Sequence, residues 1–209
     1  MNGDLGSKDV VLQREDVADD NSTKVSYPFQ EVEAYVNIKE FSDVVVKCCE
    51  TNFDCHKVFL ASRSPVFSAM FNANMKEKIE NEVQIDDIKP DVLAEMLHYI
   101  YTWKCKSLDT DLAEDLLIAA DKYQIDSLKK LCEERLICSI NTENYFSLLI
   151  LGHTYSSRIK KSVYDYVVGN KNNIKFDEGL MEYPSLMMEL LREFAIEVSF
   201  VDYSKKHLL

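Results

Sequence analysis

Glycine and proline are scarce in this 209-residue chain, which contains five of the former and four of the latter. So few chain-breaking residues favour a helix-rich fold with short connections. The sequence also lacks the glycine-rich motifs that cradle phosphates and the G-x-S-x-G turn that exposes a nucleophilic serine. We therefore expect neither a nucleotide-binding loop nor a hydrolase active site.

Long apolar runs and clustered positive charge are missing as well. The longest apolar stretches, such as LLIAA and LLILG, are far too short to span a bilayer. The net charge of −12 argues against binding to nucleic acid or to anionic membranes, because both need clustered Lys and Arg. The first 20 residues are polar and acidic and do not resemble a secretion signal. We expect an intracellular protein, nuclear and/or cytoplasmic, with no nucleic-acid or membrane partner.

The stretch CCETNFDCHK contains three of the six cysteines and one histidine. The β-branched run before it and the polar ETN within it predict a β-hairpin, in which side chains alternate between the two faces. Cys48, Phe53 and Cys55 then share one face, and Cys49 and His56 share the other. Neither face offers the four ligands of a zinc site, so we expect buried thiols and no metal. A Cys48–Cys55 disulfide is geometrically conceivable, but a reducing compartment opposes it.

No catalytic constellation is visible elsewhere. The histidines are scattered without ligand spacing, at His56, His98, His153 and His207. Cys55 and His56 are adjacent strand residues and point to opposite faces, which excludes a Cys–His nucleophile built from them. We expect no catalytic residue, no cofactor and no enzymatic activity.

The hydrophobic period predicts a hairpin followed by a long series of helices with one further strand among them. Ser64 followed by Pro65 is a typical helix start, with a capping hydroxyl and a proline at the first helical position. Asn141 or Thr142 can cap a later helix. The polar stretch 72–81 is predicted to be a loop. Helices are expected over about 29–38, 58–64, 65–71, 90–101, 112–123, 128–136, 144–153, 156–168 and 184–196, and strands over 43–49, 53–58 and 82–86.

The segment FSDVVVKCCETNFDCHKVFLASRSPVFSAMF resembles the opening half of a BTB/POZ domain. MKEK, EVQIDDIKPDVLAEMLHYIYTWK and LAEDLLIAADKYQIDSLKKLCE continue the resemblance to about residue 134. It is closest to the speckle-type POZ protein subfamily, where RSPVFSAMF and LL-x-AADKY also occur. The resemblance implies an α/β (α+β), helix-rich fold in which a small sheet is capped by helical hairpins. More weakly, the remainder resembles that subfamily's 3-box and shortened all-α BACK helices.

We therefore expect four parts along the chain. They are a disordered acidic tail over 1–27, a BTB/POZ domain over 28–138, a 3-box/BACK-like helical region over 139–196 and a C-terminal tail over 197–209. In the subfamily a MATH domain binds substrate, and we expect this chain to have none in front of the BTB unit. A short paralogue, a fragment, and a form that binds targets through a tail all stay open, as does the identity of the substrate.

BTB domains are interaction modules, and the resemblance implies that this one dimerises with itself or with a related BTB protein. The family's dimer positions match Pro28, Val32 and Tyr35 of the leading helix, with Phe59 of the next helix beside them. Pro28 stands where the family has leucine. Packing of Val32 and Tyr35 on their own core is the alternative, but a short leading helix has little core of its own.

In this subfamily the BTB domain recruits cullin-3, the scaffold of a RING ubiquitin ligase. Its contact motif, a hydrophobic residue followed two residues later by glutamate, matches Met75 and Glu77. Tyr123 is a second candidate contact, for which a core position is nearly as good an interpretation. Asp43 and Lys57 match a buried charged pair with a structural role. The resemblance thus implies a cullin-3 adaptor; the alternative is a scaffolding or transcriptional-regulatory protein that heterodimerises with full-length relatives without recruiting a ligase.

Overall fold

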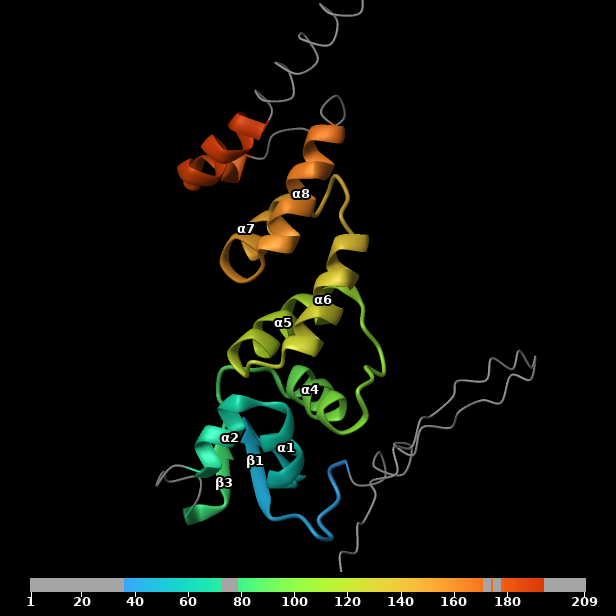
Figure 1. The fold of residues 1–209 in the computed structure, drawn as a ribbon, viewed down its shortest axis with the longest axis vertical. Helices are drawn as coiled ribbons and strands as arrows, with labels where there is room; N and C mark the ends of the chain where they lie inside the picture. Colours follow the sequence, from blue (N-terminus) through green and yellow to red (C-terminus); the bar gives the residue numbers. More distant parts are fainter. Residues whose placement is uncertain (1–35, 73–78, 171–173, 175–177, 194–209) are drawn as a thin grey trace, which may run out of the picture.

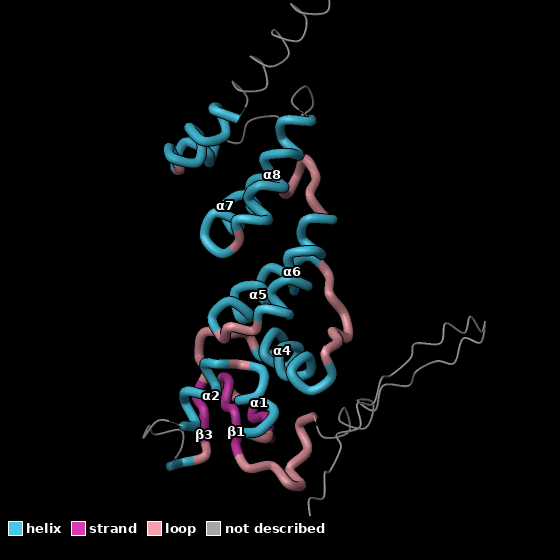
Figure 2. Tube along the Cα trace, viewed as in Figure 1, coloured by secondary structure: helices cyan, strands magenta, loops and turns pink. Residues whose placement is uncertain are grey.

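The structure, a computed structural model, describes residues 36–72, 79–170, 174 and 178–193. Among these, three strands form one sheet: β1 (Val44–Cys48), β2 (Thr51–Cys55) and β3 (Glu82–Gln84), in the order β2-β1-β3. β1 pairs antiparallel with β2 and parallel with β3. Figure 2 shows these strands together at one end of the molecule, with helices making up most of the rest. The α/β, helix-rich class expected from the sequence is confirmed.

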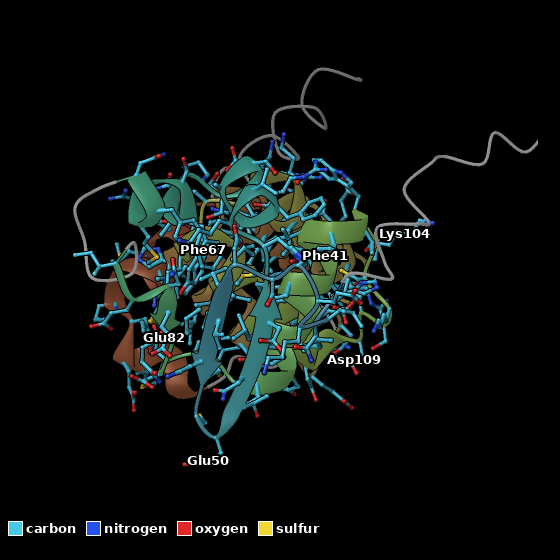
Figure 3. All side chains as sticks on the ribbon, turned by 90° about the horizontal axis from the view of Figure 1, so that it is seen from below. Phe41, Glu50, Phe67, Glu82, Lys104 and Asp109 are labelled. Carbon is cyan, nitrogen blue, oxygen red and sulfur yellow. The ribbon has the colours of Figure 1, made fainter. Side chains whose placement is uncertain are left out.

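The predicted hairpin is present, and its buried face is the one expected, but His56, expected on the other face with Cys49, lies after the end of β2 and is buried as well. Cys48, Phe53 and Cys55 are buried, whereas Cys49 is exposed in the two-residue turn between β1 and β2. Alternation along a strand explains this division, because every second side chain faces the core. Glu50 marks the tip of the hairpin, which projects from the body of the molecule in Figure 3.

Helices account for most of the remaining described residues. Their start and end points agree with the predicted segments to within a few residues for the BTB-like part and for the region after it. The bounds are α1 Lys57–Arg63, α2 Pro65–Asn72, α4 Pro90–Thr102, α5 Thr110–Lys122, α6 Asp126–Cys138, α7 Tyr145–Tyr155, α8 Ser157–Gly169 and the 3-10 helix η3 Glu178–Glu182, with further helical turns over 184–193. In Figure 1 they follow one another along the long axis: α1 and α2 beside the sheet, α4 to α6 next, then α7 and α8.

The start of α2 shows how a local sequence signal is used in tertiary packing. The Ser64 hydroxyl accepts the Phe67 N–H at 3.2 Å and donates to the Tyr123 carbonyl at 2.6 Å. One side chain therefore caps α2 and joins it to the end of α5. The rings of Phe67 and Tyr123 stack 4.7 Å apart directly beside this contact. The predicted helix start is confirmed.

Three local predictions need correction. Residues 36–38 of the expected leading helix form a turn, and the rest of that helix lies outside the described residues. Residues 79–80 of the expected loop are helical. Asn141 does not cap α7 directly: its side-chain oxygen accepts the N–H groups of Glu143 and Asn144, so it closes the turn before the helix. An Asx turn of this kind competes locally with helix capping.

The described residues that adopt a left-handed backbone conformation all have a Cβ. Asn37, Phe41, Cys49, Asn81, Trp103 and Gln124 all have positive φ angles, and no described glycine does. Trp103 ends α4, where its N–H donates to the Tyr99 carbonyl at 2.8 Å. Glycine usually occupies such a position, because its lack of a Cβ removes the steric penalty. Because glycine is scarce in this chain, residues with a Cβ occupy the strained left-handed positions at its turns.

Candidate functional site

The described part of the predicted dimer face is built around Phe59 of α1. The Phe59 ring lies 4.7 Å from the Tyr101 ring, and the Tyr101 hydroxyl accepts the His56 N–H at 2.9 Å. Phe59 is half-buried by this packing and keeps an exposed side. The other predicted dimer positions, Pro28, Val32 and Tyr35, lie outside the described residues. The structure therefore describes only the part of the predicted dimer face that α1 contributes.

Exposed apolar side chains gather where the chain enters the sheet. Asn37 Oδ1 accepts the Asp54 N–H at 2.9 Å, which holds the segment before β1 against the edge of β2. This segment exposes Ile38 and Phe41, the latter at 75%, and Val58 at the start of α1 is 69% exposed. We call Ile38, Phe41 and Val58 the entry patch. Exposed apolar residues concentrated in one region are typical of a surface that another chain covers.

A cavity of about 480 Å³ opens beside the entry patch, between β2, α4 and the first described residues. Its walls include Phe53, Leu97 and Tyr101, with His98 and Lys106 at polar positions. The lining begins at Val36, so the cavity lies directly beside the point where the predicted dimer positions continue toward the N-terminus. It is the size of a site that a few apolar side chains can fill.

Asp43 and Lys57 are in contact, but the prediction of a buried charged pair is wrong, because Asp43 is exposed, Lys57 is half-buried and the contact is made by the lysine backbone. The Lys57 N–H, at the first position of α1, donates to Asp43 Oδ1 at 2.7 Å. The Lys57 ammonium bonds the Asn81 side chain and lies 5.7 Å from the centroid of the Phe71 ring. Asp43 therefore satisfies an amide at the helix start, where a carboxylate is favoured. The sequence did not indicate Asn81 as the partner of the lysine.

The predicted cullin contacts fall into two groups. Met75 and Glu77 lie in 73–78, outside the described residues, between the end of α2 and residue 79. Tyr123 is described and is only 2% exposed, stacked on Phe67. Burial raises the pKa of Tyr123 to about 12, as expected for a phenol removed from water. This packing favours the core interpretation of Tyr123, since a side chain with so little surface has almost nothing to offer a partner.

On either side of residues 73–78, the nearest buried apolar residues are Phe71 near the end of α2 and Val83 in β3, at 9% and 1% exposure. Ile79, the first described residue after them, is 77% exposed.

A narrow groove of about 140 Å³ lies between α5 and the residues that lead into α4. Two ion pairs, Lys89–Asp115 and Lys122–Asp87, cross this groove.

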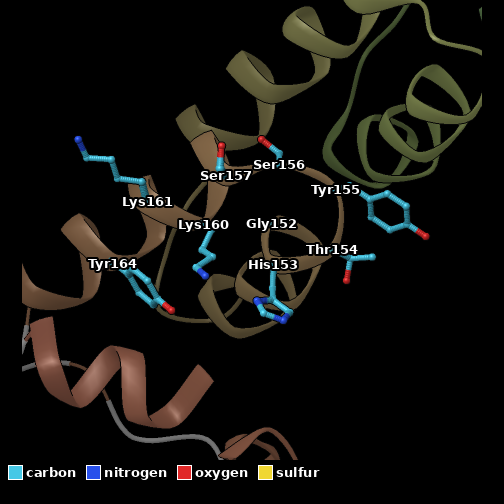
Figure 4. Close-up of a pocket in the computed structure, with 9 residues that line it drawn as sticks. All are labelled: Gly152, His153, Thr154, Tyr155, Ser156, Ser157, Lys160, Lys161 and Tyr164. Carbon is cyan, nitrogen blue, oxygen red and sulfur yellow. The ribbon is translucent and has the colours of Figure 1, made fainter. Parts of the chain in front are cut away.

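A second cavity, of about 400 Å³, lies at the turn between α7 and α8 (Figure 4). Lys160 and Tyr164 line it, and both contact Glu189: the lysine ammonium at 2.5 Å and the tyrosine hydroxyl at 2.9 Å. These two contacts hold the pKa of Glu189 below its usual value. The polar groups of this cavity thus serve to dock residues 184–193 on α8 and form no catalytic arrangement among the described residues.

The thiols of the described residues are free and mostly unreactive. Burial raises the pKa values of Cys55, Cys105 and Cys132 to about 12, and all six cysteines are unbridged. The Cys48 thiol donates to the Ile88 carbonyl at 3.0 Å. Within the described ranges, no group of three or more His, Cys, Asp or Glu could hold a metal ion. No helix there is long and apolar enough to cross a membrane.

Comparison with known proteins identifies the family. Residues 33–140 match the family model of the BTB/POZ domain. The chain belongs to the BTB/POZ family. Proteins of this family are generally interaction modules that dimerise and bind other proteins, and they are generally not enzymes. The fold, the buried hairpin face and the exposed apolar side chains near Phe59 all belong to this BTB domain.

Individual relatives cover parts of the chain. The protein maternal effect lethal 26 of Caenorhabditis elegans is 38% identical over 144 residues, which is 66% of this chain and 36% of the relative. The chain therefore spans about a third of that relative's length. The BTB domain of zebrafish PATZ1 is 27% identical with a TM-score of 0.42, covering 47% of this chain and 78% of that one. The BTB domain of human gigaxonin is 22% identical with a TM-score of 0.46, covering 58% and 98%.

Proposed function

We propose that this BTB protein acts as a dimeric adaptor that binds cullin-3 through the segment between α2 and β3. The observation that supports the proposal is the sequence position of Met75 and Glu77 between these two elements of a BTB domain. The same two elements contribute the buried residues Phe71 and Val83 to its core. A flexible methionine suits an adaptable apolar socket, and a glutamate accepts charge-assisted hydrogen bonds.

The helices after the BTB domain support the same proposal. α7 and α8 are attached to α6 by a polar contact and by buried apolar residues, which include Leu148, Ile159 and Val163. A rigid attachment lets α7 and α8 extend the surface that a long helical partner would contact. In the resemblance to the speckle-type POZ subfamily, the 3-box occupies this place.

Dimerisation is the second part of the proposal. The entry patch begins at Ile38, shortly after the predicted dimer positions Pro28, Val32 and Tyr35 in the sequence, and Phe59 keeps an exposed side. A twofold interface needs one self-complementary apolar surface, and we propose that these residues form it together. The dimer would present two cullin-binding loops.

The test is a titration of the purified chain with an N-terminal fragment of cullin-3, following affinity and mass together. We expect sub-micromolar binding at two-to-two stoichiometry. Met75→Ala and Glu77→Ala should each weaken binding by roughly tenfold, because a hot-spot residue contributes about 1–2 kcal/mol. Glu50→Ala, at the exposed tip of the hairpin, is the matched control and should bind as the parent does.

Two outcomes would contradict the proposal. If Met75→Ala and Glu77→Ala bound cullin-3 as tightly as the parent, the assignment of this loop would be wrong. If a folded dimer bound no cullin-3 at all, the alternative function would be favoured: a scaffolding or regulatory protein that pairs with full-length relatives without recruiting a ligase.

A further inference from the structure

A groove of about 670 Å³ lies where the end of α1, the start of α2 and the start of α6 meet. It shares no residue with the predicted dimer positions, the entry patch or residues 73–78. Most of the residues that line it have polar side chains, and they include Arg63, Asp126, Ser127 and Lys130.

Two cations line this groove without a carboxylate partner among the described residues. Arg63 and Lys130 form no ion pair there, whereas Lys89, Lys122 and Lys129 each bind an aspartate. Asp126 is the one carboxylate of the lining; it precedes Lys130 by one helical turn and forms no ion pair with it in the described part. The groove therefore carries an excess of positive charge in a chain whose net charge is −12.

The Arg63 guanidinium is held in place by an aromatic side chain. It lies 3.5 Å from the centroid of the Trp103 ring, and Trp103 in turn packs edge-on against Tyr99. Burial lowers the pKa of Arg63 from its ordinary value. Stacking on one face orders the guanidinium and leaves the N–H groups along its edge available, which is how arginine binds carboxylates. Ordering before binding lowers the entropy lost when a carboxylate docks.

The chain itself contains a segment of matching charge. Residues 15–20, EDVADD, carry four carboxylates and no cation. We propose that this acidic segment docks in the groove of its own chain, with its carboxylates at Arg63 and Lys130. The proposal is independent of cullin binding and adds an intramolecular contact at a separate site.

The connection is long enough for this docking. Fifteen residues lie between Asp20 and Val36, the first described residue, and an extended chain of that length spans about 50 Å. A domain of roughly 100 residues has a radius of gyration of about 13 Å, so the segment can reach any of its faces. Tethering also gives the segment a millimolar-order effective concentration, with which a free acidic peptide has to compete.

Zero-length carbodiimide cross-linking of the full chain tests the contact directly. The reagent joins a carboxylate to a lysine amine only when the two groups touch. We expect a cross-link from Lys130 to one of Glu15, Asp16, Asp19 or Asp20, lost in about 1 M salt, where the screening length falls to about 3 Å. Lys161, exposed on α8, is the control amine and should give none. Equal yields at Lys130 and Lys161 would overturn the proposal.

Mixing isotopically heavy and light chains shows which copy supplies the segment. Docking within one chain gives light–light and heavy–heavy cross-links only. Mixed heavy–light products would mean that the segment comes from a second copy, and the intramolecular proposal would fail. This result does not depend on cullin-3, so the two proposals fail separately.

Trp103, the only tryptophan of the chain, gives a second measurement because it contacts Arg63. The amide variant changes all four carboxylates of 15–20 (Glu15→Gln, Asp16→Asn, Asp19→Asn and Asp20→Asn). We expect acrylamide to quench the Trp103 fluorescence of this variant more strongly than that of the parent. In the parent, about 1 M salt should increase the quenching by the same factor. Lys161→Ala should leave quenching unchanged. Identical quenching in the parent and in the amide variant would overturn the proposal.

Discussion

Glu133 of α6 and Arg158 of α8 form an ion pair of 3.0 Å, and the glutamate side chain is 8% exposed. Its second oxygen accepts the Ser156 hydroxyl at 2.7 Å, and Ser156 also caps α8 by accepting the Ile159 N–H. One buried carboxylate thus links α6 of the BTB domain to the start of α8. A buried charge with two partners is strongly position-specific, because moving either helix would leave it uncompensated.

Removing this carboxylate should loosen the attachment of α7 and α8. We expect Glu133→Ala to lower the free energy of unfolding by about 2–3 kcal/mol, the usual range for a hydrogen-bonded buried charge. The measurement is urea unfolding followed by circular dichroism. Glu134→Ala is the control, since Glu134 is 64% exposed and contacts Arg158 only at 3.8 Å; its effect should stay below about 0.5 kcal/mol. Equal effects of the two variants would contradict the role of Glu133.

Gly152 marks the closest approach of α7 to α8. A Cβ at this position would lie 2.5 Å from the Lys160 backbone nitrogen, and backbone cannot move aside as a side chain can. We expect Gly152→Ala to destabilise the protein by about 1–3 kcal/mol through overpacking. Gly169→Ala meets nothing within 4 Å, and should be neutral or slightly stabilising in thermal unfolding. If both variants melted alike, the close approach would be wrong.

The buried thiols predict a loss of stability in alkali. Cys55 and Cys132 have pKa values raised to about 12 in the folded chain, against an ordinary value of 9.0. Since the folded state favours the protonated form, this contribution is complete below pH 9 and is lost as pH rises toward 12. Unfolding midpoints in urea should fall over that window, and Cys55→Ala should fall less steeply with pH than the parent.

The same burial sets thiol reactivity at neutral pH. Cys49 and Cys138 are exposed, whereas Cys48, Cys55 and Cys132 are buried. We expect a thiol reagent to modify two cysteines rapidly in the folded protein at pH 8 and the others only on unfolding, because the thiolate is the reactive form. Peptide mapping of the modified chain identifies them. Rapid labelling of Cys55 would show that the hairpin opens readily.

The entry patch predicts where self-association is sensitive to mutation. Phe41→Ser and Val58→Ser replace exposed apolar side chains of the entry patch, and each should shift the monomer–dimer equilibrium toward monomer by roughly tenfold, about 1.4 kcal/mol. Sedimentation equilibrium measures the shift. Met181→Ser changes a residue of similar exposure, 73%, in the C-terminal helical region and serves as the control. A dimer insensitive to Phe41 and Val58 would place the interface elsewhere.

Strong local signals in the sequence were enough to predict much of the fold. Alternation along the hairpin correctly identified the buried face, and the Ser64–Pro65 pair located the start of α2. Periodicity identified α5 to α8 because each buries residues spaced three and four apart, whereas α4 is buried on nearly all sides. The buried Tyr123 shows the limit of this approach, since a tyrosine at helical spacing has the same pattern whether its ring meets a partner or the core.

Other features depend on residues far apart in the chain. Nothing local indicates that the Lys57 ammonium binds Asn81, 24 positions away, or that Glu133 meets Ser156 and Arg158. The stacking of Arg63 on Trp103 likewise joins the ends of two separate helices. Such pairs depend on how the helices pack against one another, which composition and hydrophobic periodicity do not indicate.

The left-handed residues have a consequence for how the protein can evolve. An L-amino acid in this conformation costs roughly 1–2 kcal/mol relative to its right-handed form, a penalty that glycine escapes. Cys49 and Gln124 are exposed residues of this kind, so glycine there would stabilise the domain without removing a buried contact. A relative that acquired such glycines would have stability to spare. It could then accept destabilising substitutions in its binding surfaces while the fraction of folded protein stayed the same.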